Sequence, residues 1–162
     1  MNDLIHRALG AAGMPASLEE RGLCMSDDKR PDGRTLFAWS EGLPIAWDYT
    51  NRDTLCQSYV GKTSKVAGKA AEIAEQAKLN KYQELSDNYQ IIPVATETFG
   101  SWGSMGLKWI RQIGDRITAR TGDKRETYSL LQRISLAIQR GNVASVLGTT
   151  PKKRTMDDLF FK

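Results

Sequence analysis

The sequence predicts an α/β protein built around a mixed sheet of three to four strands with flanking helices. A predicted strand over 34–39 and an apolar run over 43–47 flank a Ser-Glu-Gly reversal at 40–42, which is typical of an antiparallel hairpin. A long segment rich in helix-forming residues then precedes a further apolar run at 91–98. A helix that crosses between two strands favours parallel pairing, so the hairpin and the crossover together indicate a mixed sheet.

Before the hairpin, the chain predicts one helix and one ambiguous element. Residues 2–13 have the apolar spacing of an amphipathic helix, which Pro15 ends. Residues 16–24 could form a short strand, and the polar turn 26–29 leads into the hairpin. The expected apolar face of the helix consists of Leu4, Ile5, Ala8, Leu9 and Ala12.

The crossover is expected to be a polar connection over 51–64 and a helix over 65–89, with Ser64 as the helix N-cap. Lys78 and Tyr82 are four residues apart and therefore share one helical face. The helix also carries small residues that would allow close packing against the sheet. These are Ala67, Ala70, Ala71, Ala74 and Ala77.

The last third of the chain predicts one strand and two helices. The strand 91–98 contains Pro93, which lacks an amide hydrogen and therefore favours an edge strand or a bulge. Apolar residues at the helical period indicate helices over 107–117 and 130–138. Gly141-Asn142 is expected as the C-cap of the second of these helices.

Composition bounds the class of protein. Hydrophobic residues make up 40% of the 162 residues and charged residues 26%, as is ordinary for a soluble globular chain. No apolar run approaches ~18 residues, and the N-terminus lacks the pattern of a secretory signal, so we expect an intracellular protein that does not span a membrane. The net charge of +4 permits a nucleic-acid partner without requiring one.

The length indicates one domain, residues 1–148, followed by a basic tail, residues 149–162. The tail carries Lys152-Lys153-Arg154, which could contact phosphates, act as a nuclear address or be an ordinary charged chain end. Cys24 and Cys56 are too few for a disulfide framework and are not spaced for zinc. We therefore expect two buried or free thiols in a reducing compartment.

Two aspartates mark the candidate site. Asp32 lies in an Arg-Pro-Asp-Gly turn and Asp48 follows the apolar run 43–47, so the hairpin can bring both carboxylates to one end of the sheet. Two such carboxylates are the minimum set for holding Mg²⁺, which prefers oxygen ligands. Taken alone, Asp32 could serve only to form the turn, since Pro-Asp-Gly suits a tight turn. Asp48 is harder to explain in that way, because an acid beside Trp47 would be costly to bury unpaired.

The element order, together with Lys29-Arg30-Pro31-Asp32 and Asp48, resembles the PD-(D/E)xK restriction-endonuclease-like superfamily, whose core is α-β-β-β-α-β. It most resembles the restriction-like endonuclease domain found C-terminal to reverse transcriptase in non-LTR retrotransposons. Fifteen residues separate the two acids, and residues 132–142 resemble a segment that follows reverse-transcriptase domains in invertebrate mobile elements. The resemblance covers roughly residues 1–150, and its motif is short and loosely spaced.

The resemblance implies a Mg²⁺-dependent (or Mn²⁺-dependent) DNA endonuclease that nicks target DNA for a mobile element. Asp32 and Asp48 would be metal ligands, joined by a backbone carbonyl near Tyr49 and by a third acid. Glu19 is the expected third acid, with Glu20 and Glu97 as alternatives. The implied partners are DNA, a reverse transcriptase in the same parent polyprotein and, in one possible arrangement, a second copy of the chain; the implied location is nuclear if the source is eukaryotic.

One departure from the family pattern concerns the catalytic cation. The family places Lys two residues after the second acid, where this chain has Thr50. The resemblance then favours Lys78 as a cation that has moved to the following helix, with Arg30, Lys81 and Tyr82 contacting DNA. Taken singly, Lys78 and Lys81 fit a solvated helix face better than a functional role.

Other functions stay open at this point. The fold could be a catalytically inactive nucleic-acid-binding or scaffolding module, or an unrelated α/β module that binds protein partners. The four tryptophans are expected to anchor the core or loops more readily than to stack on bases. They are Trp39, Trp47, Trp102 and Trp109.

Overall fold

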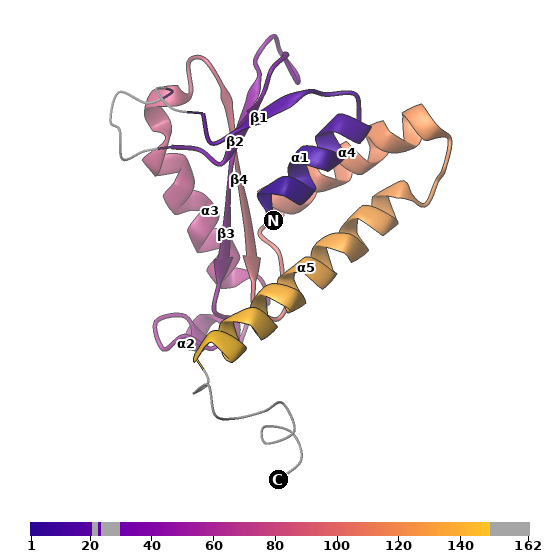
Figure 1. Ribbon diagram of the computed structural model, residues 1–162. Coiled ribbons are helices and arrows are strands. Elements are labelled where there is room, and N and C mark those ends of the chain that lie inside the picture. Colours follow the sequence, from indigo (N-terminus) through magenta and orange to yellow (C-terminus); the bar gives the residue numbers. More distant parts are fainter. Residues whose placement is uncertain (21–22, 24–29, 150–162) are drawn as a thin grey trace.

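The computed structural model describes residues 1–20, 23 and 30–149, which form an α/β fold around one four-stranded sheet (Figure 1). The strands lie in the order β1-β2-β3-β4. The first three strands pair antiparallel, whereas β3 and β4 pair in parallel across the helical crossover. The mixed sheet that the sequence predicts is therefore confirmed. The strands are β1 Ala16–Leu18, β2 Gly33–Thr35, β3 Ile45–Arg52 and β4 Gln90–Glu97.

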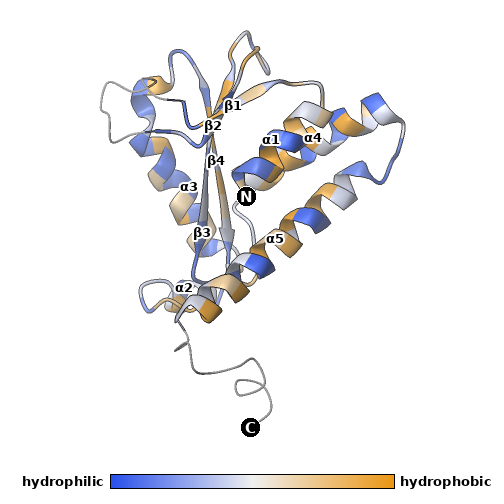
Figure 2. Ribbon diagram, viewed as in Figure 1, coloured by the Kyte–Doolittle hydropathy of each residue, from blue (hydrophilic) through white to orange (hydrophobic). Residues whose placement is uncertain are grey.

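Helices cover both faces of the sheet. α3 lies on one face, whereas α1 and α4 lie on the other and α5 packs against α4 (Figure 1). Hydrophobic residues recur along α1, α4 and α5 (Figure 2). No helix in the described part of the chain is long and apolar enough to cross a membrane. The helices are α1 Asn2–Ala11, α2 Val60–Thr63, α3 Lys69–Lys81, α4 Ser104–Thr121 and α5 Glu126–Thr149.

The alternation of side chains along β3 divides the interior between the two faces. Ile45 and Trp47 point toward α4 and join the main hydrophobic core, in which the Trp47 ring lies 5.7 Å from that of Trp109. Ala46 and Asp48 point the other way, toward α3. A single strand thus supplies both a core residue and, next to it, the buried acid.

Gly33 makes room for Trp47. A Cβ atom at Gly33 would lie 2.3 Å from Cζ2 of Trp47 and 2.7 Å from the carbonyl oxygen of Ser17. Neither neighbour can yield easily, because the indole is fully buried and the carbonyl belongs to β1. Glycine is therefore required here for close packing between the strand and the indole.

We expect Gly33→Ala to lower the free energy of unfolding by about 1–3 kcal/mol, the usual cost of overpacking a core. Urea unfolding followed by circular dichroism measures this difference. Gly10→Ala is the matched control, because nothing lies within 4 Å of a Cβ at Gly10 and alanine favours a helix. Equal midpoints for Gly33→Ala and the parent protein would contradict the prediction.

Pro93 lies in β4, which is an edge strand, as the sequence predicts. The Gly103 N–H donates to the Ala95 carbonyl, and the Glu97 N–H donates to the Ser101 carbonyl. The odd-numbered residues of β4 therefore direct their backbone N–H and C=O groups away from β3. Pro93 is also odd-numbered, so the position where it lacks an N–H lies on the outer edge of the sheet. Pairing with β3 is not interrupted: Pro93 stands opposite Asp48 in the register.

The long helix is shorter than its composition suggests. It begins at Lys69, after Gly68 adopts a left-handed conformation with φ of 82°, and the expected N-cap Ser64 instead ends the short helix α2. A Cβ at Gly68 would lie 2.6 Å from the carbonyl oxygen of Trp102, so a tertiary contact fixes this boundary. At the other end, Tyr82 leaves the helical conformation and a 3-10 turn follows.

Other boundaries also differ from the sequence prediction: β3 continues past Asp48 to Arg52, and the expected polar connection 51–64 contains the short helix α2. α5 continues through Gly141 and Asn142 to Thr149 in place of ending there, and the Asn142 side chain donates to the carbonyl of Thr98 at 2.7 Å. The strand expected over 34–39 ends at Thr35, whose hydroxyl accepts the N–H of Ile45 and donates to the carbonyl of Phe37. Cys24, Lys29 and the basic cluster Lys152-Lys153-Arg154 lie outside the described residues.

Candidate functional site

Asp48 is the buried acid at the centre of the candidate site. It lies in β3, faces α3 and is 5% exposed. Lys78 Nζ donates to its Oδ1 at 2.6 Å, and the hydroxyl of Tyr82 donates to its Oδ2. The spacing of four residues places both donors over the same strand. The buried carboxylate therefore has a cation and a hydroxyl as partners, which offsets the cost of its desolvation.

Asp32 lies beside this group. It precedes β2, and its Oδ2 accepts the backbone N–H of Tyr49 at 2.6 Å, so it touches the strand immediately after Asp48. Burial raises the pKa of the Asp32 carboxyl, and the negative charge of Asp48 adds to that increase. The Tyr49 hydrogen bond, a side-chain hydrogen bond from Asn2 and the charge of Lys78 oppose it. The two carboxylates are thus close enough for each to feel the charge of the other.

Tyr82 links the site to the segment that precedes Asp32. Its hydroxyl is buried and lies 2.9 Å from the carbonyl oxygen of Arg30, as well as against Asp48. Lys81 lies 4.7 Å from the centre of the Tyr82 ring. Of the residues expected to contact DNA, Tyr82 therefore belongs to the cluster itself, while Lys81 contacts the cluster through the ring and Arg30 through its backbone.

The acids expected as a third metal ligand have other partners. Glu19 pairs with the Arg30 guanidinium at 3.3 Å. Hydrogen bonds from Arg34 and Ser17 lower the pKa of Glu20 to about 2. Within residues 1–20, 23 and 30–149, no group of three or more His, Cys, Asp and Glu side chains is placed to hold a metal ion.

Two buried glutamates hold the helices in place. Glu97, at the end of β4, accepts the backbone N–H of Ala70 at 2.9 Å at the start of α3. Glu75 accepts the N–H groups of Met105 and Gly106 at the start of α4, at 3.1 and 2.8 Å. Carboxylates are favourable at helix N-termini, where backbone N–H groups lack partners within the helix. Glu97 thereby helps to fix the helix that carries Lys78.

Sequence reasoning missed Glu75. Burial raises its pKa, and the hydrogen bonds from Gly106 and Met105 oppose that increase. A Cβ at Gly103 would lie 2.3 Å from the Glu75 carboxylate, so the glycine leaves space for it. The pair Gly103 and Gly106 at a helix start is the one signal in the sequence that could have indicated a buried partner.

The residues of the cluster fit a divalent cation in chemical type. Asp32 and Asp48 offer carboxylate oxygens, which magnesium and manganese prefer. An ionised carboxylate has about four acceptor positions, so the bonds from Lys78 and Tyr82 leave Asp48 further capacity. Asp32 and Asp48 would be the protein ligands of such an ion.

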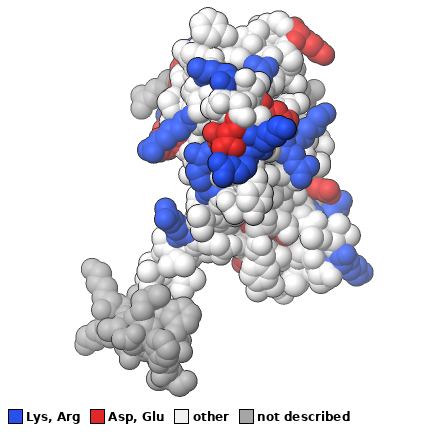
Figure 3. All heavy atoms as spheres, turned by 90° about the vertical axis from the view of Figure 1, so that its right-hand side faces the viewer, with Lys and Arg blue, Asp and Glu red and all other residues white. Residues whose placement is uncertain are grey.

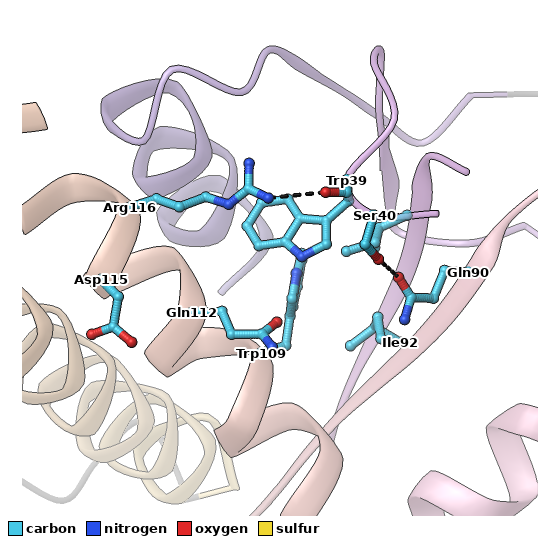
Figure 4. A pocket seen from close by; sticks show the side chains of 9 residues that line it. Trp39, Ser40, Gln90, Ile92, Trp109, Gln112, Asp115 and Arg116 are labelled. Carbon is cyan, nitrogen blue, oxygen red and sulfur yellow. Dashed lines mark hydrogen bonds between the residues drawn. The ribbon is translucent and has the colours of Figure 1, made fainter. Parts of the chain in front are cut away.

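A separate hollow of about 360 Å³ lies on the α4 side of the sheet (Figure 4). Trp39 and Trp109 form its apolar wall with their rings in an edge-to-face arrangement. The guanidinium of Arg116 lies 3.7 Å from the centre of the Trp39 ring and donates to the Trp39 carbonyl at 2.9 Å. Arg116 therefore occupies the indole face that a base would need. The expectation that these tryptophans serve the core is confirmed for both, and also for Trp47.

Basic side chains also lie on the surface away from the candidate site (Figure 3). On the side that Figure 3 presents, Lys and Arg outnumber Asp and Glu. Several are paired, including Arg7 with Asp3 at 2.6 Å and Arg133 with Glu126 at 3.9 Å. These residues belong to α1 and α5, across the sheet from the face that carries Lys78. They could contribute a mild, sequence-independent attraction for phosphate.

No protein-family model matches the chain, and a comparison with curated proteins finds no match. The arrangement of side chains around Asp48 is accordingly the basis for any functional conclusion.

Proposed function

We propose that the protein is a metal-dependent DNA endonuclease with a restriction-endonuclease-like core. The observation that carries the proposal is the convergence of Asp32 and Asp48 from the hairpin with Lys78 and Tyr82 from the crossover helix. Two acids, a cation and a hydroxyl from separate elements meet over one buried position of β3. A solvated lysine on a helix face would not need such a partner.

Phosphodiester hydrolysis needs an activated water, neutralised charge on the phosphoryl group and a stabilised leaving oxygen. The chemistry supplied by a bound Mg²⁺ or Mn²⁺ is acidification of water and withdrawal of charge from the phosphoryl oxygen. Asp32 and Asp48 would hold the ion. Lys78 would orient the attacking water or offset phosphate charge, and Tyr82 would keep the Asp48 carboxylate in a fixed orientation.

The proposal extends to the biological setting that the sequence resemblance suggests. The substrate would be target DNA nicked for a mobile element, and a reverse transcriptase would belong to the same parent polyprotein. Nuclear location in a eukaryote and pairing of two copies to cut both strands follow from the same setting.

A second candidate function is nucleic-acid binding without catalysis. Both carboxylate oxygens of Asp48 already accept hydrogen bonds, and Thr50 stands where the family pattern has lysine. A site that has lost the family's catalytic lysine could keep the hydrogen bonds around Asp48 for a purely structural purpose. DNA binding through the surface arginines would then remain, with no cleavage.

Plasmid nicking distinguishes the two functions. We expect the intact chain to relax supercoiled plasmid in Mg²⁺ or Mn²⁺ and to stop when a chelator removes the metal. Binding to a labelled duplex is measured in parallel at several salt concentrations, in the presence of the chelator. Salt-dependent binding with no nicking under either metal would overturn the nuclease proposal and favour the binding module.

A further inference from the structure

We propose that residues 156–161 of this chain dock into a groove between α1 and α5. The sequence of this segment, which lies outside the described residues, is Met-Asp-Asp-Leu-Phe-Phe. The groove lies across the sheet from the face that carries Lys78. The proposed contact therefore does not depend on the metal site or on the nuclease function.

The groove is an open hollow of about 690 Å³, to which α4 contributes Ile117 and Thr121. Its apolar lining combines alanines with leucines, so it has space for larger apolar side chains. Leu136 lines it and is still 59% exposed, which shows that the described part of the chain does not fill the hollow. The apolar residues that α1 and α5 supply are Leu4, Ala8, Ala11, Leu130, Leu136 and Ala137.

The groove also carries an excess of positive charge. Three arginines and two acids line it, which leaves one positive charge over. Arg7 pairs with Asp3 at 2.6 Å, and Arg133 lies 3.9 Å from Glu126, at the limit of an ion pair. Arg140 has no hydrogen bond or ion pair to any described residue. An apolar groove with an unpaired arginine fits an occupant that has both large apolar side chains and acids.

Residues 156–161 have this composition. Four of the six side chains are large and apolar, and the other two are Asp157 and Asp158. Met156, Leu159 and Phe160 have the i, i+3, i+4 spacing with which short amphipathic segments insert anchors into a groove between helices. The two acids then supply charge opposite to that of the groove.

The connecting chain is long enough for the segment to reach the groove. α5 runs toward α2 and ends at Thr149 (Figure 1). At 1.5 Å per residue, Leu136 lies about 20 Å back along the helix axis from that end. Residues 150–155 span about 20 Å when extended, so Met156 can lie level with Leu136. Pro151 disfavours continuation of the helix, which lets the chain turn back along α5.

The test measures how fast a thiol in the groove reacts with a neutral alkylating reagent in the full chain. Cys24→Ser and Cys56→Ser first remove the native thiols. Leu136→Cys then places a thiol in the groove, and Ser135→Cys is the matched control, an exposed neighbour turned about 100° around α5 and absent from the groove lining. We expect Leu136→Cys to react about 10-fold more slowly than Ser135→Cys, which corresponds to a groove occupied about 90% of the time.

Removing the apolar anchors should abolish this protection. With Leu159→Ser, Phe160→Ser and Phe161→Ser combined in one chain, the Leu136→Cys thiol should react as fast as the Ser135→Cys thiol. Equal rates before the anchors are removed, or protection that survives their removal, would overturn the proposal. Protection that fades on dilution would overturn docking within one chain and assign the groove to the segment of a second copy.

A reversal of charge tests the role of the arginine. Arg140→Glu should weaken the protection, and adding Asp157→Lys with Asp158→Lys to that variant should restore it. Arg111→Glu is the matched control, because Arg111 is exposed on α4 and does not line the groove. Equal protection in the Arg140→Glu and Arg111→Glu variants would contradict the proposed charge pairing.

Discussion

Replacing Asp48 by asparagine is expected to eliminate DNA nicking while the protein stays folded. The amide has the size of the carboxylate and can still accept the Tyr82 hydroxyl, but it has no charge with which to hold a cation. Lys78 has a long side chain that is 20% exposed, so its ammonium group can turn toward water when its partner becomes neutral. We expect nicking to fall by more than about 100-fold, the upper range for changes to residues that only support a metal ligand.

Initial rates of plasmid relaxation in Mn²⁺ measure this effect, and thermal unfolding checks the fold. Asp53→Asn is the matched control. Asp53 is exposed just beyond the end of β3 and accepts the N–H of Leu55, which asparagine can also do. A variant at Asp48 that unfolds like the parent and nicks at the parental rate would rule out a role for this acid in cleavage.

Replacing Lys78 by methionine is expected to lower the free energy of unfolding by about 3 kcal/mol. The substitution leaves a carboxylate at Asp48 that is 7% exposed in its side chain and has lost its cation. Breaking a buried ion pair from one side is strongly destabilising, because the remaining charge stays desolvated. Tyr82 retains its hydrogen bond to Asp48 and keeps the loss at the lower end of the usual range. Urea unfolding at neutral pH measures the difference.

The double variant Asp48→Asn, Lys78→Met tests whether the unpaired Asp48 carboxylate causes the loss of stability. With both charges removed, most of the stability lost in the Lys78→Met variant should return, whereas nicking should not. Lys69→Met is the control on the same helix, since the Lys69 ammonium pairs with Glu72 at the surface. A Lys78→Met variant as stable as the Lys69→Met control would indicate that the ion pair is worth no more than a surface pair.

The sequence predicts the centre of the site because the determining relations there are local. Asp32 and Asp48 are brought together by one hairpin, and Lys78 and Tyr82 by one turn of helix. Side chains alternate between the two faces of a strand, so a buried Trp47 in the core places Asp48 on the opposite face. Pro93 likewise carries its own structural constraint, since a residue without an amide hydrogen cannot occupy an interior ladder.

The parts that escape prediction depend on partners far apart in the sequence. The start of α3 is set by the approach of Gly68 to the backbone of Trp102 and by Glu97, which accepts the first N–H groups of the helix. Neither contact produces a periodic pattern in the sequence. In the sequence Glu75 resembles any other helix residue, because its partner, the N–H of Gly106, belongs to α4. The pairing of Glu19 with Arg30 likewise has no signal in the sequence.

The edges of the sheet bear on how the isolated protein behaves at high concentration. Unpaired strand edges are templates for joining other chains into aggregates. Here β1 has only three residues, and the outer edge of β4 is closed near Ala95 and Glu97 by the chain's own backbone and interrupted at Pro93. Little backbone is left to recruit a strand from a neighbour. Self-association by strand addition is therefore disfavoured, and the concentrated samples that metal titrations require should stay dispersed.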